Sequence, residues 1–207
     1  MKIIIFGASG RTGQHLVNQA LEIGHEVSAV VRDSSKLQLQ HPRLSVVKAS
    51  LEQPLEPVIR GSDAVLSALG PTKGGSKTIM RTAAKSIVTA MQKSGVKRLI
   101  TLTGAGVAQP GDQPKAFNHL MSFMLNLFAK DVLIDSSEHA AIVRASGLAY
   151  TIVRVPVLTD AAASKHIRVG MVGINDGARI SRADVATYML QQLEDSSQIG
   201  QAPVISG

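Results

Sequence analysis

Three glycines near the start of the chain have the spacing of a loop that binds phosphate. They follow the apolar run Ile3–Phe6 in the stretch MKIIIFGASGRTG, and they are Gly7, Gly10 and Gly13. A helical pattern over Thr12–Ile23 comes next, so the glycines lie between a predicted strand and a predicted helix. Glycines let an anion approach the free N–H groups of a helix N-terminus. Because a tight turn alone needs one or two glycines, three of them beside the Ser9 and Thr12 hydroxyls favour phosphate binding.

A second polar stretch follows the next predicted strand, Val27–Val31, and reads RDSSK. In dinucleotide-binding folds, an acidic residue roughly 20 positions beyond the glycines binds the ribose 2′-hydroxyl, whereas an arginine accommodates a 2′-phosphate. Arg32 and Lys36 suit a phosphate dianion, and Ser34 or Ser35 can donate to it. Asp33 suits a 2′-hydroxyl instead, and an ordinary solvated turn is the third reading. On balance the stretch favours NADP(H) over NAD(H).

Three further predicted strands end in residues expected at the same edge of the sheet. The strands are Ala64–Leu69, Leu99–Thr103 and Tyr150–Val155. Ligands of open α/β sheets bind beyond the carboxyl ends of the strands. We therefore expect the ligand to be bordered by the residues that end these strands, namely Leu69, Gly70, Thr103 and Pro156.

The alternation of short apolar runs with helical stretches predicts a parallel sheet with helices on both faces, which is a doubly wound α/β fold. A short strand is expected at Leu44–Val47. A long helix is expected to run to about Lys93, from a cap at Ser76 or Thr78 to Gly95 at its C-terminal end. Ser181 and Asp184 have the spacing of a capping box, for a helix to about Leu193. A last strand is expected at Val204–Ser206. Residues 160–180 read as an irregular loop or small hairpin, and the proline-containing stretches 53–57 and 109–114 read as loops.

The composition fits one globular domain over residues 1–207, with small substrate-side segments near 109–140 and 157–180. The chain has no cysteine, which excludes disulfides and thiolate chemistry, and its six histidines are scattered, so no metal site is expected. No stretch is long enough for a membrane span, and we expect a cytoplasmic protein with no membrane partner.

The net charge of +7 suits either nucleic acid or a small anionic ligand. Aromatic residues make up only 3% of the chain, so surfaces for stacking bases are scarce. We therefore expect a small-molecule partner and no nucleic acid, in a monomer or homodimer.

Taken together, these stretches resemble the atypical short-chain dehydrogenase/reductase superfamily, in particular its NAD(P)H-binding members related to biliverdin reductase B (flavin reductase). The stretches are IIIFGASGRTG, EVSAVVRDSSKL, GSDAVLSALGP, VKRLITLTGAG, IVRASGLAYTIVRVP and ARISRADVATYMLQQL. The resemblance implies a single Rossmann-type domain, NADPH as cofactor, and hydride transfer to a flavin such as FMN, a tetrapyrrole-like compound or a quinone. It implies cofactor contacts at Gly7, Ser9, Gly10, Arg11, Thr12, Gly13, Arg32, Ser35, Lys36, Leu69, Gly70, Thr103 and Pro156.

The chain departs from that family at its catalytic positions. Gly104 stands where the reductase has a serine, and Val157 stands where it has a histidine. The superfamily's Tyr-x-x-x-Lys is also missing. Thr103 is the nearest hydroxyl and the one catalytic candidate. Flavins and quinones can take their proton from water, so they remain suitable acceptors. The alternative is a regulatory protein that senses NADP(H) without turnover.

Two other groups of residues stand out. The stretch Phe117–Phe128 is apolar on nearly all sides at helical spacing, which suits core first, a pocket wall second and a subunit interface third. A group of acidic residues and histidines lies near this stretch in the sequence, and we interpret each of them as a solvated residue or a helix cap. They are His119, Asp131, Asp135, Glu138 and His139. Arg154 reads as a buried ion-pair partner in preference to an anion contact.

Overall fold

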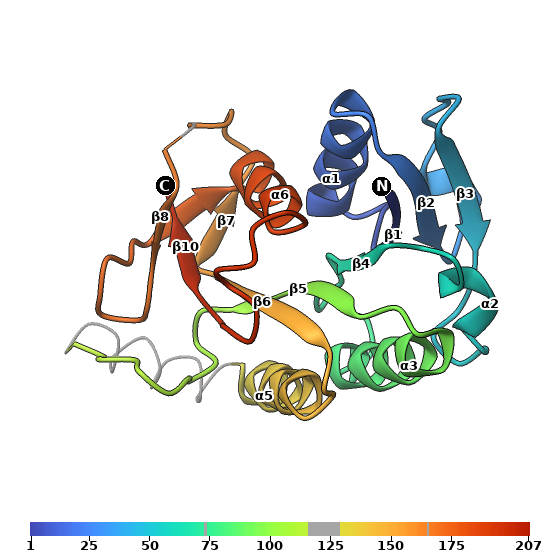
Figure 1. Cartoon of the computed structure of the whole chain (residues 1–207). Coiled ribbons are helices and arrows are strands. Elements are labelled where there is room, and N and C mark those ends of the chain that lie inside the picture. Colours follow the sequence, from blue (N-terminus) through green and yellow to red (C-terminus); the bar gives the residue numbers. More distant parts are fainter. Residues whose placement is uncertain (73, 116–128, 165) are drawn as a thin grey trace.

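The structure is a computed structural model that describes residues 1–72, 74–115, 129–164 and 166–207. Its centre is an eight-stranded sheet in the order β3–β2–β1–β4–β5–β6–β10–β8 (Figure 1). The strands are β1 (Lys2–Phe6), β2 (Glu26–Val31), β3 (Leu44–Lys48), β4 (Ala64–Ser67), β5 (Arg98–Gly104), β6 (Ala149–Val155), β8 (Arg168–Gly170) and β10 (Val204–Ser206). Every neighbouring pair is parallel except β8, which runs antiparallel to β10. The predicted Rossmann-type α/β fold is confirmed.

Helices cover both faces of this sheet, as the sequence predicts. The described helices are α1 (Arg11–Glu22), α2 (Glu56–Ile59), α3 (Ile79–Ser94), α5 (Lys130–Arg144) and α6 (Arg182–Gln191), with a 3-10 turn η1 (Ser34–Lys36). Figure 1 shows α1 and α6 on one side of the sheet and α3 and α5 on the other. Gln19 joins α1 to α6, since its Nε2 donates to the Ala183 carbonyl at 3.1 Å and its Oε1 accepts from Thr187 at 3.0 Å.

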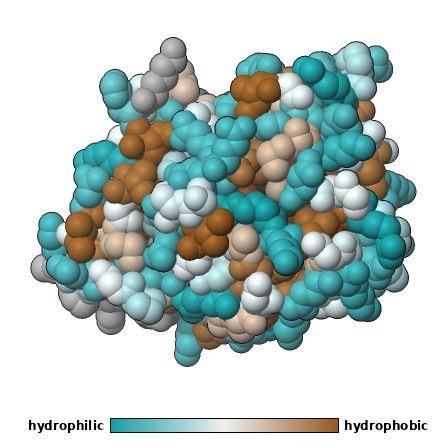
Figure 2. All heavy atoms as spheres, in the orientation of Figure 1, coloured by the Kyte–Doolittle hydropathy of each residue, from teal (hydrophilic) through white to brown (hydrophobic). Residues whose placement is uncertain are grey.

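The alternation of side chains along each central strand produces two hydrophobic clusters. In β1, Ile3 and Ile5 pack on the side of α1 and α6, whereas Ile4 and Phe6 pack on the side of α3 and α5. Strands buried on both faces are continuously apolar for this reason. In the view of Figure 2, the apolar side chains that reach the surface form small separate patches among hydrophilic ones. Over the residues that the structure describes, no helix is long and apolar enough to cross a membrane.

The long helix α3 is capped differently from the prediction. Thr78 is its N-cap residue, but neither its side chain nor that of Ser76 caps the helix. Asp135 of α5 does so instead, because its carboxylate accepts from the N–H groups of Met80 and Arg81 at 2.9 and 3.1 Å. The predicted C-terminal end is confirmed, with Gly95 in the left-handed conformation at φ +72°. Asp135, which is far from α3 in the sequence, therefore caps this helix in place of the Ser76 or Thr78 hydroxyl.

The segment after β6 is more regular than predicted. Val157–Thr159 forms β7, which pairs in parallel with β9 (Arg179–Ser181) in a small second sheet. Between them, β8 joins the main sheet rather than a local hairpin. The stretch 53–57 also runs into α2, so it is not wholly loop.

Other predictions from the sequence stand as follows. The capping box is confirmed, since the Ser181 hydroxyl accepts from the Asp184 N–H at 3.0 Å. The strand expected over Ala64–Leu69 ends at Ser67, so Leu69 lies beyond it. The predictions for Phe117–Phe128 and His119 lie outside the described residues.

Candidate functional site

The glycine loop sits at the carboxyl end of β1, and two of its glycines are required by close packing. A Cβ atom on Gly13 would lie 2.0 Å from the Gly7 carbonyl oxygen. Gly7 has φ +75°, and a Cβ there would lie 2.9 Å from the Ala68 carbonyl carbon at the end of β4. The Gly10 N–H closes the loop by donating to the Gly7 carbonyl at 2.9 Å. Side chains at Gly7 or Gly13 would therefore separate α1 from the sheet.

The N-terminus of α1 is left without a counter-charge of its own. Gly10 is its N-cap, no side-chain cap is present among the described residues, and the first turn holds no acidic residue. Thr12 is buried, whereas Gly10 and Arg11 are exposed. Gln14 donates to the Ser9 carbonyl at 3.1 Å, which fixes the loop from the helix side. The free N–H groups and the helix dipole make this corner suited to an anion.

The turn after β2 is organised around Asp33. One carboxylate oxygen of Asp33 accepts from both the N–H and the hydroxyl of Ser35, at 3.0 and 2.7 Å. These hydrogen bonds, together with the charges of Lys36 and Lys48, lower the pKa of Asp33. Ser35 was predicted as a phosphate donor, but in this structure its hydroxyl donates to Asp33. Arg32 and Lys36 are exposed on either side of it, as a phosphate clamp requires.

Lys48 at this turn was missed by the sequence analysis. It ends β3 and pairs in the parallel ladder with Val31, directly before Arg32. Its position follows from strand pairing between β2 and β3, which a single sequence does not reveal. The signal that would have found it is its place as the last residue of the short third strand.

The residues predicted to border the ligand lie near the carboxyl ends of β4, β5 and β6. Leu69, Gly70 and Pro156 are partly exposed there. Thr103 is only 4% exposed, and its hydroxyl finds no hydrogen-bond partner in the described part of the chain. Because a buried hydroxyl without a partner is costly, Thr103 is suited to a polar group supplied from outside.

The two catalytic departures from the related reductases face open space. Gly104 is exposed, and a Cβ added to it would meet no described atom within 4 Å. Val157 is 59% exposed at the start of β7. A hydroxyl group would fit at position 104 and an imidazole at position 157, but this chain has glycine and valine there.

The two tyrosines are also unsuited to proton donation at this edge. Tyr150 is the second residue of β6 and pairs with Leu99 near the start of β5, at the opposite end of the sheet from Thr103. Tyr188 lies in α6 with its hydroxyl buried, and burial raises its pKa to about 12. Neither side chain supplies an acid beside Thr103.

Arg154 is buried in an ion pair, as the sequence favoured. It is in register with Thr103, and its guanidinium donates to both carboxylate oxygens of Asp112 at 2.8 Å. Asp112 also accepts from the N–H groups of Gln109 and Val172. Burial alone would raise the pKa of Asp112, but the bonds from Arg154 and the backbone lower it. This pair ties two loops, around residues 107–113 and 171–173, to β6.

A second bridging carboxylate, Asp160, was not predicted. Its two oxygens accept from Arg11 at 2.9 Å and from Arg182 at 2.6 Å. These arginines are the first residues of α1 and α6, so Asp160 links the glycine loop to the segment that follows β7. Arg11 was predicted as a cofactor contact, and here it remains 71% exposed.

His139 was read as a solvated or capping residue, and that is wrong. Its side chain is 3% exposed between α5 and β5, and Nε2 lies 3.0 Å from the Thr101 hydroxyl. Burial lowers its pKa to about 4. His139 is therefore a neutral core residue at ordinary pH. No group of metal-ligating side chains was found where the structure describes them.

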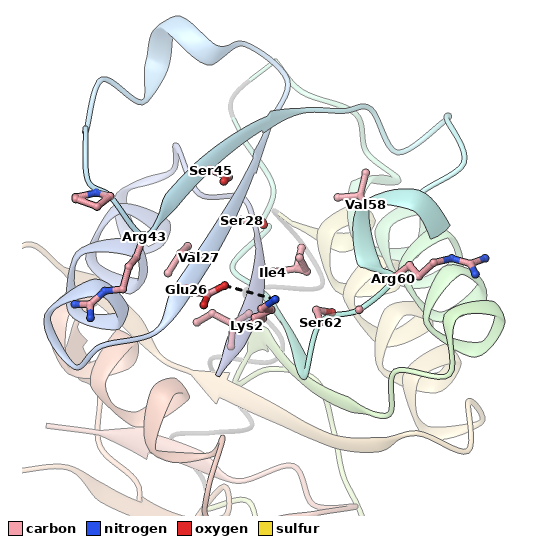
Figure 3. Close-up of a pocket in the computed structure, with 13 residues that line it drawn as sticks. Lys2, Ile4, Glu26, Val27, Ser28, Arg43, Ser45, Val58, Arg60 and Ser62 are labelled. Carbon is pink, nitrogen blue, oxygen red and sulfur yellow. Dashed lines mark ion pairs between the residues drawn. The ribbon is translucent and has the colours of Figure 1, made fainter.

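A hollow of about 480 Å³ lies at the other end of the sheet from the glycine loop (Figure 3). Lys2 and Glu26, at the amino ends of β1 and β2, line it and form an exposed ion pair at 3.8 Å. Ser28 of β2 pairs with Ser45 of β3 and with Ile4 of β1, and all three residues line the same hollow. Because nucleotides bind beyond the carboxyl ends of such strands, this hollow is not the candidate cofactor site.

Comparison with known proteins identifies the class of ligand. The pattern that defines the NAD(P)H-binding family matches residues 7–196 and so includes the glycine loop and the elements from α1 to α6. Among curated relatives, the uncharacterized protein YwnB of Bacillus subtilis is 32% identical over 106 residues, which are 51% of this chain and 48% of YwnB. The matched part thus spans about half the length of that relative.

Solved structures share the whole fold. A short-chain dehydrogenase/reductase of Veillonella parvula, solved with NADP, has a TM-score of 0.81 at 20% identity, over 100% of this chain and 94% of that one. SP1627 of Streptococcus pneumoniae, a candidate NADH-flavin reductase, has a TM-score of 0.78 at 21% identity, over 100% of this chain and 99% of that one. At such identities the likeness shows the fold alone.

Proposed function

We propose that this chain, which belongs to the NAD(P)H-binding family, is an NADPH-dependent oxidoreductase that passes hydride to a flavin, a quinone or a similar conjugated acceptor. The observation that carries the proposal is the glycine loop, where the N-terminus of α1 is uncapped and the helix begins against the Gly7 carbonyl. The pyrophosphate of the cofactor would bind there, at Gly7, Ser9, Gly10, Arg11, Thr12 and Gly13.

The preference for NADPH is supported by the turn after β2. Arg32 and Lys36 lie exposed where the adenosine ribose of a dinucleotide would end. Asp33 is less suited to a 2′-hydroxyl than the sequence suggested, because one of its oxygens is already occupied by Ser35. Arg32→Ala should therefore weaken NADPH binding far more than NADH binding.

The other end of the cofactor would reach Thr103 and Pro156, with Leu69 and Gly70 along its course. Thr103 has a buried hydroxyl without a described partner, which suits a contact to the nicotinamide amide or to the acceptor. When bound, the cofactor supplies the hydride, and the protein supplies orientation.

The acceptor class follows from the lack of a proton donor beside Thr103 among the residues that the structure describes. Gly104 and Val157 carry no acid, and neither tyrosine lies beside Thr103. A simple ketone needs a proton on its oxygen as hydride arrives, whereas reduced flavins and quinones can take theirs from water. The site therefore favours conjugated acceptors, with FMN as a suitable substrate.

The test is a direct assay. The purified protein is mixed with NADPH and either FMN or a quinone, and the loss of nicotinamide absorbance is followed. Oxidation that depends on the acceptor supports the proposal. Tight NADPH binding without oxidation across a panel of acceptors would instead indicate an NADP(H)-sensing regulatory protein, and failure to bind either cofactor would overturn both functions.

Thr103→Val is the matched variant for the catalytic candidate, because it keeps the shape of the side chain and removes the hydroxyl. If Thr103 contacts the reacting groups, the turnover number falls while the dissociation constant for NADPH changes little. An unchanged turnover number would show that Thr103 is not a catalytic residue.

A further inference from the structure

The end of β3 contributes a cation to the turn that follows β2. Lys48 is the last residue of β3, and its ladder partner is Val31, the last residue of β2. The Ala49 N–H donates to the Val31 carbonyl at 3.1 Å, which holds the two strand ends together beyond the last pair. Neighbouring strands lie about 4.8 Å apart, so Lys48 is fixed beside Arg32 and the RDSSK turn.

Lys48 is close enough to Asp33, in the turn after β2, for its charge to act on the Asp33 carboxylate. Lys36 and Lys48 both act on the Asp33 carboxylate through their charges, and both contribute to its lowered pKa. The turn and the strand end beside it thus hold three exposed cations, Arg32, Lys36 and Lys48, and one carboxylate, Asp33. The local excess of positive charge suits a dianion better than a neutral hydroxyl.

The strand also explains which way Lys48 points. Leu44 packs on the cluster beneath α1, and side chains alternate along a strand, so Val46 and Lys48 share that face of β3. Val31, the ladder partner of Lys48, packs on the same cluster. The lysine stem therefore leaves the sheet on the side of α1, the helix whose N-terminus would hold the pyrophosphate.

We propose that Lys48 is a specificity-determining residue that, with Arg32 and Lys36, binds the 2′-phosphate of NADPH. This inference rests on the proposed function, because it assigns a contact within the same cofactor site. It adds Lys48, from the end of β3, to the phosphate-binding residues that the sequence predicts after β2. Asp33 supplies a negative charge near Lys36 and Lys48 before the phosphate arrives.

The experiment compares NADPH and NADH binding by the wild-type chain and by Lys48→Ala, through the fluorescence of the reduced nicotinamide. Loss of one charge-assisted contact should weaken NADPH binding about tenfold. NADH binding should change by less than about twofold, because NADH has no 2′-phosphate. Lys48→Arg keeps the charge and should stay within about threefold of the wild type for NADPH.

Lys2→Ala is the matched control. It removes the same charge from the same sheet, but at the amino end beside the hollow of Figure 3. It should leave both dissociation constants within about twofold, which separates a contact from a general change in net charge. Should Lys48→Ala fold poorly, Lys48→Gln keeps the stem of the side chain and tests the same charge.

The outcomes distinguish the inference from the function on which it rests. If the wild-type chain binds neither cofactor, the proposed function fails before any variant is made. If the wild type binds NADPH but Lys48→Ala weakens both cofactors equally, or neither, the role of Lys48 is overturned while NADPH binding stands. A loss confined to NADPH supports it.

Discussion

Two arginine–aspartate pairs in this molecule have nearly the same length and opposite surroundings. Arg154 and Asp112 lie 2.8 Å apart, with side chains 0% and 10% exposed. Arg11 and Asp160 lie 2.9 Å apart, with side chains 71% and 61% exposed. The distance between the charged atoms therefore does not distinguish the two pairs, whereas the burial of their side chains does. The buried pair fixes loops to the sheet, whereas the exposed pair leaves Arg11 free to take a phosphate as a second partner.

The largest effect should come from breaking the buried pair. Arg154→Met should lower the free energy of unfolding by about 3–5 kcal/mol, because it leaves the largely buried charge of Asp112 without its partner. Arg11→Met, the matched change in the exposed pair, should cost at most about 1 kcal/mol. Urea denaturation measures both, and equal losses in the two variants would contradict the comparison.

A second comparison of buried and exposed groups uses the pH dependence of the free energy of unfolding, to which the buried His139 contributes. His139 is neutral when folded, with its pKa lowered from 6.5 to about 4. Its contribution to stability is complete above pH 6.5 and is lost as the pH falls towards 4, because the unfolded chain binds the proton more readily. The loss should amount to about 3 kcal/mol. His139→Gln should remove this part of the slope of unfolding free energy against pH. A slope that the variant leaves intact would mean that His139 is not buried as described.

Two glycines of the candidate site differ in their surroundings, because Gly13 is tightly packed and Gly104 is exposed. Gly13→Ala places a Cβ 2.0 Å from the Gly7 carbonyl, and we expect a loss of about 1–3 kcal/mol in unfolding free energy. Gly104→Ala enters open space and should stay within about 0.5 kcal/mol of the wild type. Thermal or urea unfolding tests the pair. If Gly13→Ala is as stable as Gly104→Ala, the close approach of α1 to the loop is not a packing requirement.

A smaller effect than that of Arg154→Met should come from the bridge at Asp160, whose own side chain is exposed. Asp160→Asn removes a charge that contacts the exposed Arg11 and the nearly buried Arg182, and the free energy of unfolding should fall by about 1–2 kcal/mol. High salt should shrink this difference, because it screens exposed charges, and should leave the effect of Arg154→Met nearly unchanged. A loss of several kcal/mol from Asp160→Asn would place this bridge among the structural pairs.

The sequence predicts the elements of this fold that depend on local pattern. The glycine turn, the apolar strands β1, β2 and β5, and the capping box at Ser181 all follow from residue type and spacing. Gly95 ends α3 as predicted because a left-handed residue is needed there. These features need no knowledge of what packs against them.

The predictions that failed depend on contacts between distant residues. Asp135 caps α3 from 55 positions away, and His139 is buried because α5 packs against β5. Lys48 joins the turn after β2 only through strand pairing. Part of the candidate site was thus visible as a motif, whereas the carboxylate that links Arg11 to Arg182 was not. Spacing along the chain carries no information about such partners.

The position of β10 has a consequence for the order in which the chain becomes structured during synthesis. β10 lies between β6 and β8, and its residues Val204–Ser206 are fully buried. Strands β1 to β6 can pair as the ribosome releases them from N- to C-terminus. β8, by contrast, must wait for a strand made more than thirty residues later before it can join the main sheet. The segment that contains β8 should therefore be the last to resist a protease in a growing chain.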